Sequence, residues 1–302
     1  MVVEEIRQQE ESDRRSKAVS QVKQGQWMNW EGVERRKISW RDLWNMEAAS
    51  LSFRIRASYD VLPTPANLNQ WLGEDPLCPL CSVRGTLKHI LTGCKVSLSQ
   101  GRYTWRHNQV LKCLADSLDA KRLVNNSLPA SSSTAGHSID FVQAGKAKKN
   151  YTKSNHGVLN KARDWQMMVD VGQRLVIPSV IITSQLRPDI VLWSLSQRTV
   201  YLIELTVPWE GSIEEAFERK KLRYADLAAE AEQRGWATKI RPVEVGCRGF
   251  VAKSTTKLLR DMGFGGRTLR RAIREPGDTA ERSSHWLWSK RRDQEWYSKK
   301  RN

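Results

Sequence analysis

The stretch RPDIVLWSLSQRTVYLIELTVPWE, residues 187–210, constrains the fold of this chain more than any other segment. Two runs rich in Ile, Leu, Val, Trp and Tyr flank a few polar residues, a pattern typical of a β-hairpin. With residues 196–197 as a two-residue loop, the pairing register places Asp189 directly opposite Glu204. Both faces of the hairpin are otherwise apolar, as in a central strand pair covered by helices. The sequence therefore predicts an α/β fold with this hairpin inside its sheet.

In this register the hairpin carries two acids on one face, with Cβ atoms about 5 Å apart. Like charges at this distance repel, and one carboxyl group takes a raised pKa unless a cation lies between them. Oxygen ligands of this kind suit Mg²⁺ or Mn²⁺, so Asp189 and Glu204 are candidate ligands of a catalytic metal. The loop is not an Asn-Gly turn, and a slip by one residue would point the acids to opposite faces.

The segment after the hairpin predicts a helix that begins at Ser212, where Ser212 and Glu215 have the spacing of a capping box. One face of this helix carries an apolar stripe that a single lysine interrupts: Ile213, Phe217, Lys220, Tyr224 and Leu227. A lysine near two carboxylates is typical of metal-dependent nucleases, where it orients or deprotonates the attacking water. The alternative is a lysine that reaches solvent along an ordinary amphipathic helix, with both acids exposed at strand ends.

A cluster of Cys and His follows the pattern C-x2-C-x7-H-x4-C and comprises Cys78, Cys81, His89 and Cys94. Two cysteines separated by two residues form a tight turn, and one His with a third Cys completes a tetrahedral Zn²⁺ site. Because protein side chains fill all four positions, this zinc is expected to be structural. We assign no chemistry to the other histidines, because none has a potential nucleophile at a spacing that indicates catalysis: His107, His137, His156 and His285.

The chain of 302 residues is strongly basic, with 50 Lys and Arg against 33 Asp and Glu. A net charge of +17 spread along the sequence predicts a polyanionic partner, nucleic acid before membrane. The sequence has no apolar run of about 20 residues and no signal peptide, so we expect a soluble intracellular protein. Several of the 13 tryptophans lie among basic residues, as in RKISWRDLW, and suit core anchors or stacking platforms for bases.

We expect five regions along the chain: a basic helical linker region at 1–60, a zinc-knuckle region at 61–124, a flexible Ser- and Lys-rich linker at 125–155, the α/β core at 156–275, and a basic, Trp-rich C-terminal helix at 276–302. The core is expected to contain a helix at 158–175 and a strand at 179–183 before the hairpin. After it we expect a strand at 240–246 and a turn at 246–250. Asp170 on the first of these helices is a candidate extra acid or a solvated surface residue.

The motifs CPLC…H…C, GRYTWRHNQVL, RPDIVLWS, IELTVPWE, ERKKLRYADL and VEVGCRGF resemble the C-terminal part of non-LTR retrotransposon proteins with a restriction-like endonuclease. The resemblance runs from about residue 26 onward. It implies a restriction-endonuclease-like (PD-(D/E)xK) core at 156–275, a CCHC zinc knuckle and flanking basic helices. By motif it assigns Asp189, Glu204 and Lys220 as catalytic, with the lysine displaced onto the helix. The family usually has this lysine two residues after the glutamate. In this chain Thr206 occupies that position.

The resemblance implies a nuclear protein that nicks one strand of a genomic DNA target, so that reverse transcription starts from the freed end. Element RNA is a further candidate partner, and the oligomeric state stays open. The sequence has no polymerase motif, so we expect a fragment or remnant of such a protein. Two alternatives remain: a catalytically inactive nucleic-acid-binding remnant, and a zinc-dependent interaction protein unrelated to DNA.

Overall fold

The fold was analysed in a computed structural model, which describes residues 2–21, 24–26, 30–35, 38–128 and 157–296. Most of the Ser- and Lys-rich segment expected at 125–155 lies outside these residues, as do His137 and His156. Within the described ranges, no helix has the length and apolar character that a membrane span requires.

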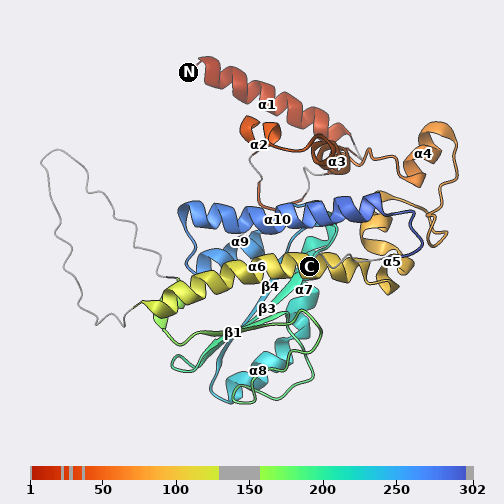
Figure 1. The fold of residues 1–302 in the computed structure, drawn as a ribbon. Helices are drawn as coiled ribbons and strands as arrows, with labels where there is room; N and C mark the ends of the chain where they lie inside the picture. The colour runs from red at the N-terminus through yellow and green to blue at the C-terminus, as the bar shows by residue number, and fades with distance from the viewer. Residues whose placement is uncertain (1, 22–23, 27–29, 36–37, 129–156, 297–302) are drawn as a thin grey trace, which may run out of the picture.

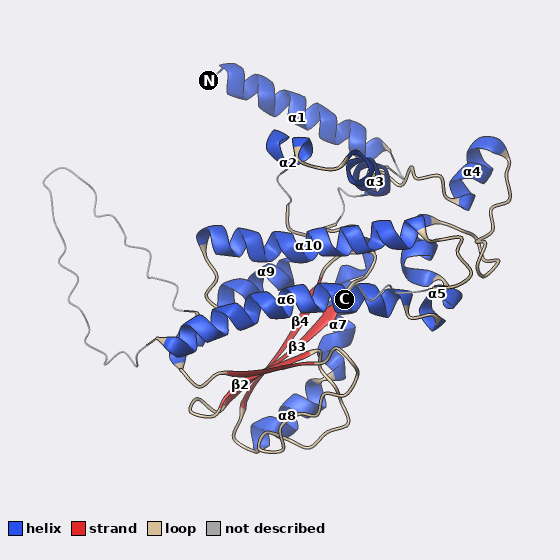
Figure 2. Ribbon diagram, viewed as in Figure 1, coloured by secondary structure: helices blue, strands red, loops and turns tan. Residues whose placement is uncertain are grey.

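A four-stranded mixed sheet forms the centre of the fold (Figure 2), in the order β1-β2-β3-β4. Its strands are β1 (Gln166–Val169), β2 (Ile190–Ser194), β3 (Thr199–Thr206) and β4 (Ala237–Glu244). β1, β2 and β3 pair antiparallel, and β4 runs parallel to β3. The pairs Ile190↔Ile203 and Val191↔Leu202 confirm the hairpin register that the sequence predicts.

Two expectations for the segment before the hairpin are wrong. The predicted helix at 158–175 is a short 3₁₀ turn, η3 (Val158–Lys161), followed by the edge strand β1. The predicted strand at 179–183 is a turn, in which the amide groups of Ile181 and Ile182 donate to Pro178 O. Both isoleucines are buried without joining the sheet, because the turn directs them into the core beneath β2 and β3.

Helices cover both faces of the sheet (Figure 1). One face packs against α6 (Arg102–Ser127), α9 (Lys253–Asp261) and α10 (Gly266–Ser289), where Leu111, Leu114 and Leu258 meet Ile203 and Val243 in one core. The other face packs against the helix pair α7 (Ile213–Arg223) and α8 (Ala225–Gln233). The predicted apolar stripe of α6 is confirmed, because its members are buried: Val110, Leu111, Leu114 and Leu118.

The expected turn at 246–250 is confirmed and requires its glycine. Gly249 has φ +93°, and a Cβ on it would lie 2.9 Å from Gly277 O of α10. Only glycine permits this close crossing of the turn and the helix.

The N-terminal part of the chain is helical and includes the cysteine cluster. It contains α1 (Val2–Ser20), α2 (Trp40–Trp44), α3 (Ala48–Ser58), α4 (Pro65–Leu72), the π-helix η2 (His89–Gly93) and α5 (Lys95–Ser99). A core that includes Phe53, Leu91 and Leu287 joins α3 and the cysteine cluster to the C-terminal end of α10. Beside it, the buried Arg248 forms an ion pair with Glu210 of the 3₁₀ turn η4 (Glu210–Ser212).

Candidate functional site

The hairpin brings Asp189 and Glu204 together at the point where β2 begins and β3 nears its end. The amide of Asp189 donates to Glu204 Oε2 at 3.2 Å, and the amide of Leu205 donates to Asp189 Oδ2 at 2.7 Å. Each carboxylate therefore accepts a hydrogen bond from the backbone of the other strand, as the predicted register requires.

Helix α7 supplies the third predicted side chain. Lys220 Nζ forms an ion pair with Glu204 Oε1, and both side chains are largely buried. Tyr224, one turn later, is fully buried and donates from its hydroxyl to Glu204 Oε2 at 2.8 Å. The lysine therefore points to the carboxylates, and the alternative in which it reaches solvent is wrong. The stripe that positions it is buried at Ile213, Tyr224 and Leu227.

The start of α7 differs from the prediction. Ser212 makes no side-chain hydrogen bond to the helix, so the expected capping box with Glu215 is not formed. The short turn η4 instead leads into the helix, and the amide of Ser212 donates to Trp209 O at 2.8 Å.

Burial and charge repulsion determine the pKa of Glu204 beside Asp189. Burial raises the pKa of Glu204, and the charge of Asp189 raises it further, whereas Lys220 and the hydroxyl of Tyr224 act to lower it. The net shift is upward, so one lysine does not fully offset two carboxylates in this buried setting. In the described part of the chain, Asp189 Oδ1 receives no hydrogen bond, which leaves one carboxylate oxygen for an added cation.

Sequence reasoning missed His107, which α6 places against the carboxylates. Its Nε2 lies 3.3 Å from Asp189 Oδ2 and 3.3 Å from Leu205 O. Both neighbours are acceptors, so Nε2 carries a hydrogen. Burial acts to lower the pKa of His107, but the hydrogen bond and charge of Asp189 outweigh it and the pKa is raised. The signal was in the sequence: His107 continues the apolar stripe of Val110 and Leu111 toward the N-terminus, as Lys220 does on α7.

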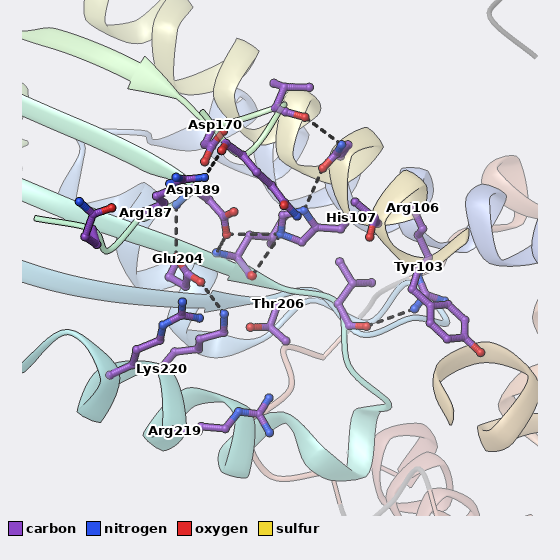
Figure 3. Close-up of a pocket in the computed structure, with 18 residues that line it drawn as sticks. Tyr103, Arg106, His107, Asp170, Arg187, Asp189, Glu204, Thr206, Arg219 and Lys220 are labelled. Carbon is purple, nitrogen blue, oxygen red and sulfur yellow. Dashed lines mark hydrogen bonds and ion pairs between the residues drawn. The ribbon is translucent and has the colours of Figure 1, made fainter. Parts of the chain in front are cut away.

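These side chains surround one open cavity of about 680 Å³. Figure 3 shows Asp189, Glu204, Lys220 and His107 turned toward one another, from the residue before β2, from β3, from α7 and from α6 respectively. The cavity is predominantly basic, because arginines from three parts of the chain also line it: Arg106, Arg187, Arg219 and Arg223. A cavity with two central carboxylates and a cationic wall suits a phosphate-containing substrate.

Asp170 also lines this cavity, on the loop that follows β1. Its amide donates to Asp189 O at 2.8 Å, and its Oδ1 accepts from the amide of Arg174 at 2.9 Å. The Asp170 carboxylate therefore stabilises the turn in which it lies, next to Asp189 and Glu204. Thr206 lines the cavity as well, and its hydroxyl has no hydrogen-bond partner among the described residues.

The four predicted metal ligands converge in a separate cluster. The ligand atoms of Cys78, Cys81, His89 and Cys94 lie within 4.8 Å of one another, so the cluster could hold a structural zinc. Within the ranges that the structure describes, this is the one group of three or more His, Cys, Asp or Glu side chains close enough to share an ion. The CPLC turn is fixed by the amide of Cys78, which donates to Val83 O at 2.7 Å.

The cluster is tied to α6 through Tyr103. The Tyr103 hydroxyl accepts from the amide of Cys94 at 3.0 Å and donates to Ile90 O at 2.9 Å. Burial raises the pKa of Cys78 to about 11, so a thiolate at this position requires a cation beside it. Burial also lowers the pKa of His89, which favours the neutral imidazole that binds metal.

No protein-family model matches this chain, and the search of curated proteins finds no match.

Proposed function

We propose that this protein is a Mg²⁺-dependent DNA endonuclease with a restriction-endonuclease-like (PD-(D/E)xK) core. The observation that carries the proposal is the convergence of Asp189, Glu204 and Lys220 in one basic cavity. Asp189 immediately precedes β2, Glu204 lies on β3 and Lys220 lies on α7, and the sequence predicts all three. Metal-dependent phosphodiester hydrolysis uses this combination of metal ligands and a cation near the attacking water.

Asp189 and Glu204 fit a divalent metal because both are oxygen donors and one Asp189 oxygen has no hydrogen bond among the described residues. A Mg²⁺ or Mn²⁺ ion held by Asp189 and Glu204 would supply Lewis-acid charge that polarises a phosphoryl oxygen. The ammonium group of Lys220, which is paired with Glu204, would also donate a hydrogen bond to the attacking water and orient it. The exposed Arg219 and Arg223 lie one helical turn apart and offset the charge of the phosphates at the cavity mouth.

The resemblance to non-LTR retrotransposon proteins supports a more specific role. We propose that the chain nicks one strand of nuclear target DNA, and that it corresponds to the part of such a protein that lacks the polymerase. The Cys78–Cys94 cluster with a bound Zn²⁺ and the basic C-terminal residues 290–292 would hold the DNA backbone. Binding should therefore weaken steeply as salt increases.

A nicking assay on supercoiled plasmid tests this proposal. The wild-type protein should convert the plasmid to its open circular form in Mg²⁺ and not in EDTA. Asp189→Asn and Lys220→Met should each lower the rate by at least about a hundredfold, because each removes a group that acts on the reacting phosphate. Lys221→Met is the matched control, since Lys221 is exposed and does not line the cavity. Plasmid binding by all variants should match the wild type; a wild type that binds plasmid without nicking it would refute the proposal.

A second candidate is a nucleic-acid-binding remnant without catalysis. One observation favours it: both oxygens of Glu204 are already engaged, Oε1 by Lys220 and Oε2 by Tyr224. A carboxylate fixed in this way must exchange partners before it binds a metal. The same assay separates the two candidates, because the remnant would bind DNA with the same salt dependence and cut nothing at any Mg²⁺ or Mn²⁺ concentration.

A further inference from the structure

The loop that follows β1 borders the cavity at Asp189 on the side away from α7. We call residues 170–174 the rim loop, and its members Asp170 and Gln173 line the cavity. Figure 3 shows Asp170 on the far side of Asp189 from Arg219 of α7. The rim loop therefore lies across the two carboxylates from the arginines of α7.

Hydrogen bonds hold the rim loop in one shape although little of it is buried. Asn108 Nδ2 of α6 donates to Val171 O at 3.1 Å, and the guanidinium group of Arg187 donates to Gln173 O. Gln173 has φ +57°, a left-handed conformation that residues other than glycine rarely adopt. Val171, Gln173 and Arg174 are exposed, so burial of their side chains does not explain this conformation. Backbone strain of this kind gathers at functional sites, which points to a role for the exposed side chains of the loop.

Two primary amides line the cavity from this part of the chain. Gln173 belongs to the rim loop, and Gln185 lies in the segment that leads into β2; both are exposed. Neither amide group makes a hydrogen bond within the described ranges. The cavity residues of α7 are instead all cationic: Arg219, Lys220 and Arg223. An amide carries a donor and an acceptor but no charge, so it suits the edge of a base better than a phosphate.

The two kinds of side chain match the two kinds of surface that duplex DNA presents. A phosphodiester held at the carboxylates lies beside a groove, so the cations of α7 contact phosphates and the two amides meet base edges. In the major groove, adenine alone presents an acceptor, N7, next to a donor, the N6 amino group. One glutamine amide satisfies both atoms with two hydrogen bonds, and the minor groove offers no such pattern.

We infer that Gln173 and Gln185 select an A·T base pair next to the phosphate that the cavity holds, by hydrogen bonds to adenine in the major groove of double-stranded DNA. The inference rests on the proposed function for the identity of that phosphate as the one that is cut. The base preference itself requires only that duplex DNA binds at the cavity. It can therefore be measured without cleavage.

A binding selection in EDTA tests this base preference. The wild-type protein is mixed with a pool of DNA duplexes that carry a randomised central segment, and the bound fraction is sequenced. Adenine should be enriched at one position or at two adjacent positions. Gln173→Ala/Gln185→Ala should lose this enrichment and bind the selected duplex about tenfold more weakly. Its affinity for an unselected duplex and its salt dependence should match the wild type, because the amides carry no charge.

Two further arms establish that the contact is to the base. Gln173→Arg should shift the preferred base from adenine to guanine, because arginine pairs with the two acceptors of guanine. 7-Deazaadenine, which lacks the N7 acceptor, should weaken wild-type binding when it replaces the selected adenine, and should not affect the double alanine variant. A glutamine that only supports the loop would produce neither result.

Gln197 provides the matched control. It is exposed on the loop between β2 and β3 and does not line the cavity, so Gln197→Ala should keep the wild-type preference. Far-UV circular dichroism and the urea midpoint of each variant establish that it is folded.

The position of the nick in Mg²⁺ separates this inference from the proposed function. The wild type should nick beside the selected adenine, and a wild type that shows the preference in EDTA but never nicks would refute the proposed function alone. A wild type that enriches no base would overturn the inference, as would a preference that survives the double alanine variant. An equal loss of affinity for all duplexes in that variant would overturn it too, because contacts to phosphate carry no sequence information.

Discussion

Glu244 at the end of β4 is a fully buried carboxyl group without a cation partner in the described residues. Ser254 donates a hydrogen bond to its Oε2, and its Oε1 receives none there. Burial raises the pKa of Glu244 from 4.5 to about 7, although the Ser254 hydroxyl acts to lower it. Between pH 4.5 and about 7, the folded protein therefore keeps a proton on Glu244 that the unfolded chain loses.

The direction and size of the effect follow from this difference. Below pH 4.5 the carboxyl group is protonated in both states and has no effect on stability. As the pH rises toward 7 only the unfolded state ionises, so the free energy of unfolding falls. With these pKa values the loss is about 2 kcal/mol between pH 5.5 and 8, and about 3 kcal/mol in full. Glu244→Gln keeps an acceptor for Ser254 and removes the ionisation.

Urea unfolding followed by circular dichroism, at several values from pH 5.5 to 8, measures this contribution. The wild type should lose about 2 kcal/mol of unfolding free energy relative to Glu244→Gln across the range. The difference between the two proteins cancels the titration of all other groups. A constant difference across the range would refute the argument, because it would mean that Glu244 ionises as readily in the folded protein as in the unfolded chain.

Three further predictions concern the metal cluster, His107 and the buried ion pair. Cys81→Ser should release zinc, measured by a chromogenic chelator, and lower the thermal midpoint; a metal content equal to that of the wild type would contradict it. His107→Ala should slow nicking about tenfold or more and raise the Mg²⁺ concentration for half-maximal rate, because Asp189 loses a hydrogen bond that positions it, and His107→Gln should recover part of the rate. Arg248→Met should destabilise the fold by about 3–5 kcal/mol in urea unfolding, since it leaves Glu210 charged and buried, whereas Arg234→Met on the exposed end of α8 should change stability by under about 1 kcal/mol.

The hairpin and its two acids could be predicted because strand periodicity fixes both register and facing. Once two residues are assigned to the loop, every cross-strand pair from Ser194↔Thr199 to Ile190↔Ile203 follows. The lysine was equally predictable, since a helical stripe defines the face that packs on the sheet. Local sequence patterns were therefore sufficient to predict the three central residues of the candidate site.

The segment before the hairpin could not be predicted for a different reason. Residues 158–175 contain helix-favouring residues, yet Gln166–Val169 form a strand because β2 offers them an open edge. At 179–183 the β-branched residues suggest a strand, but the turn at Pro178 places them in the core without a strand partner. In both cases a tertiary contact decides the local structure.

Tyr103 and His107 are one turn apart on α6, and this spacing couples the two sites. Tyr103 is bonded to the backbone of the cysteine cluster, and His107 to the carboxylate of Asp189. An α-helical turn is stiff, so the two anchors move as one body about 6 Å long. A metal ion held by the cysteine cluster would therefore help to keep His107 in place, and with it the carboxylate of Asp189.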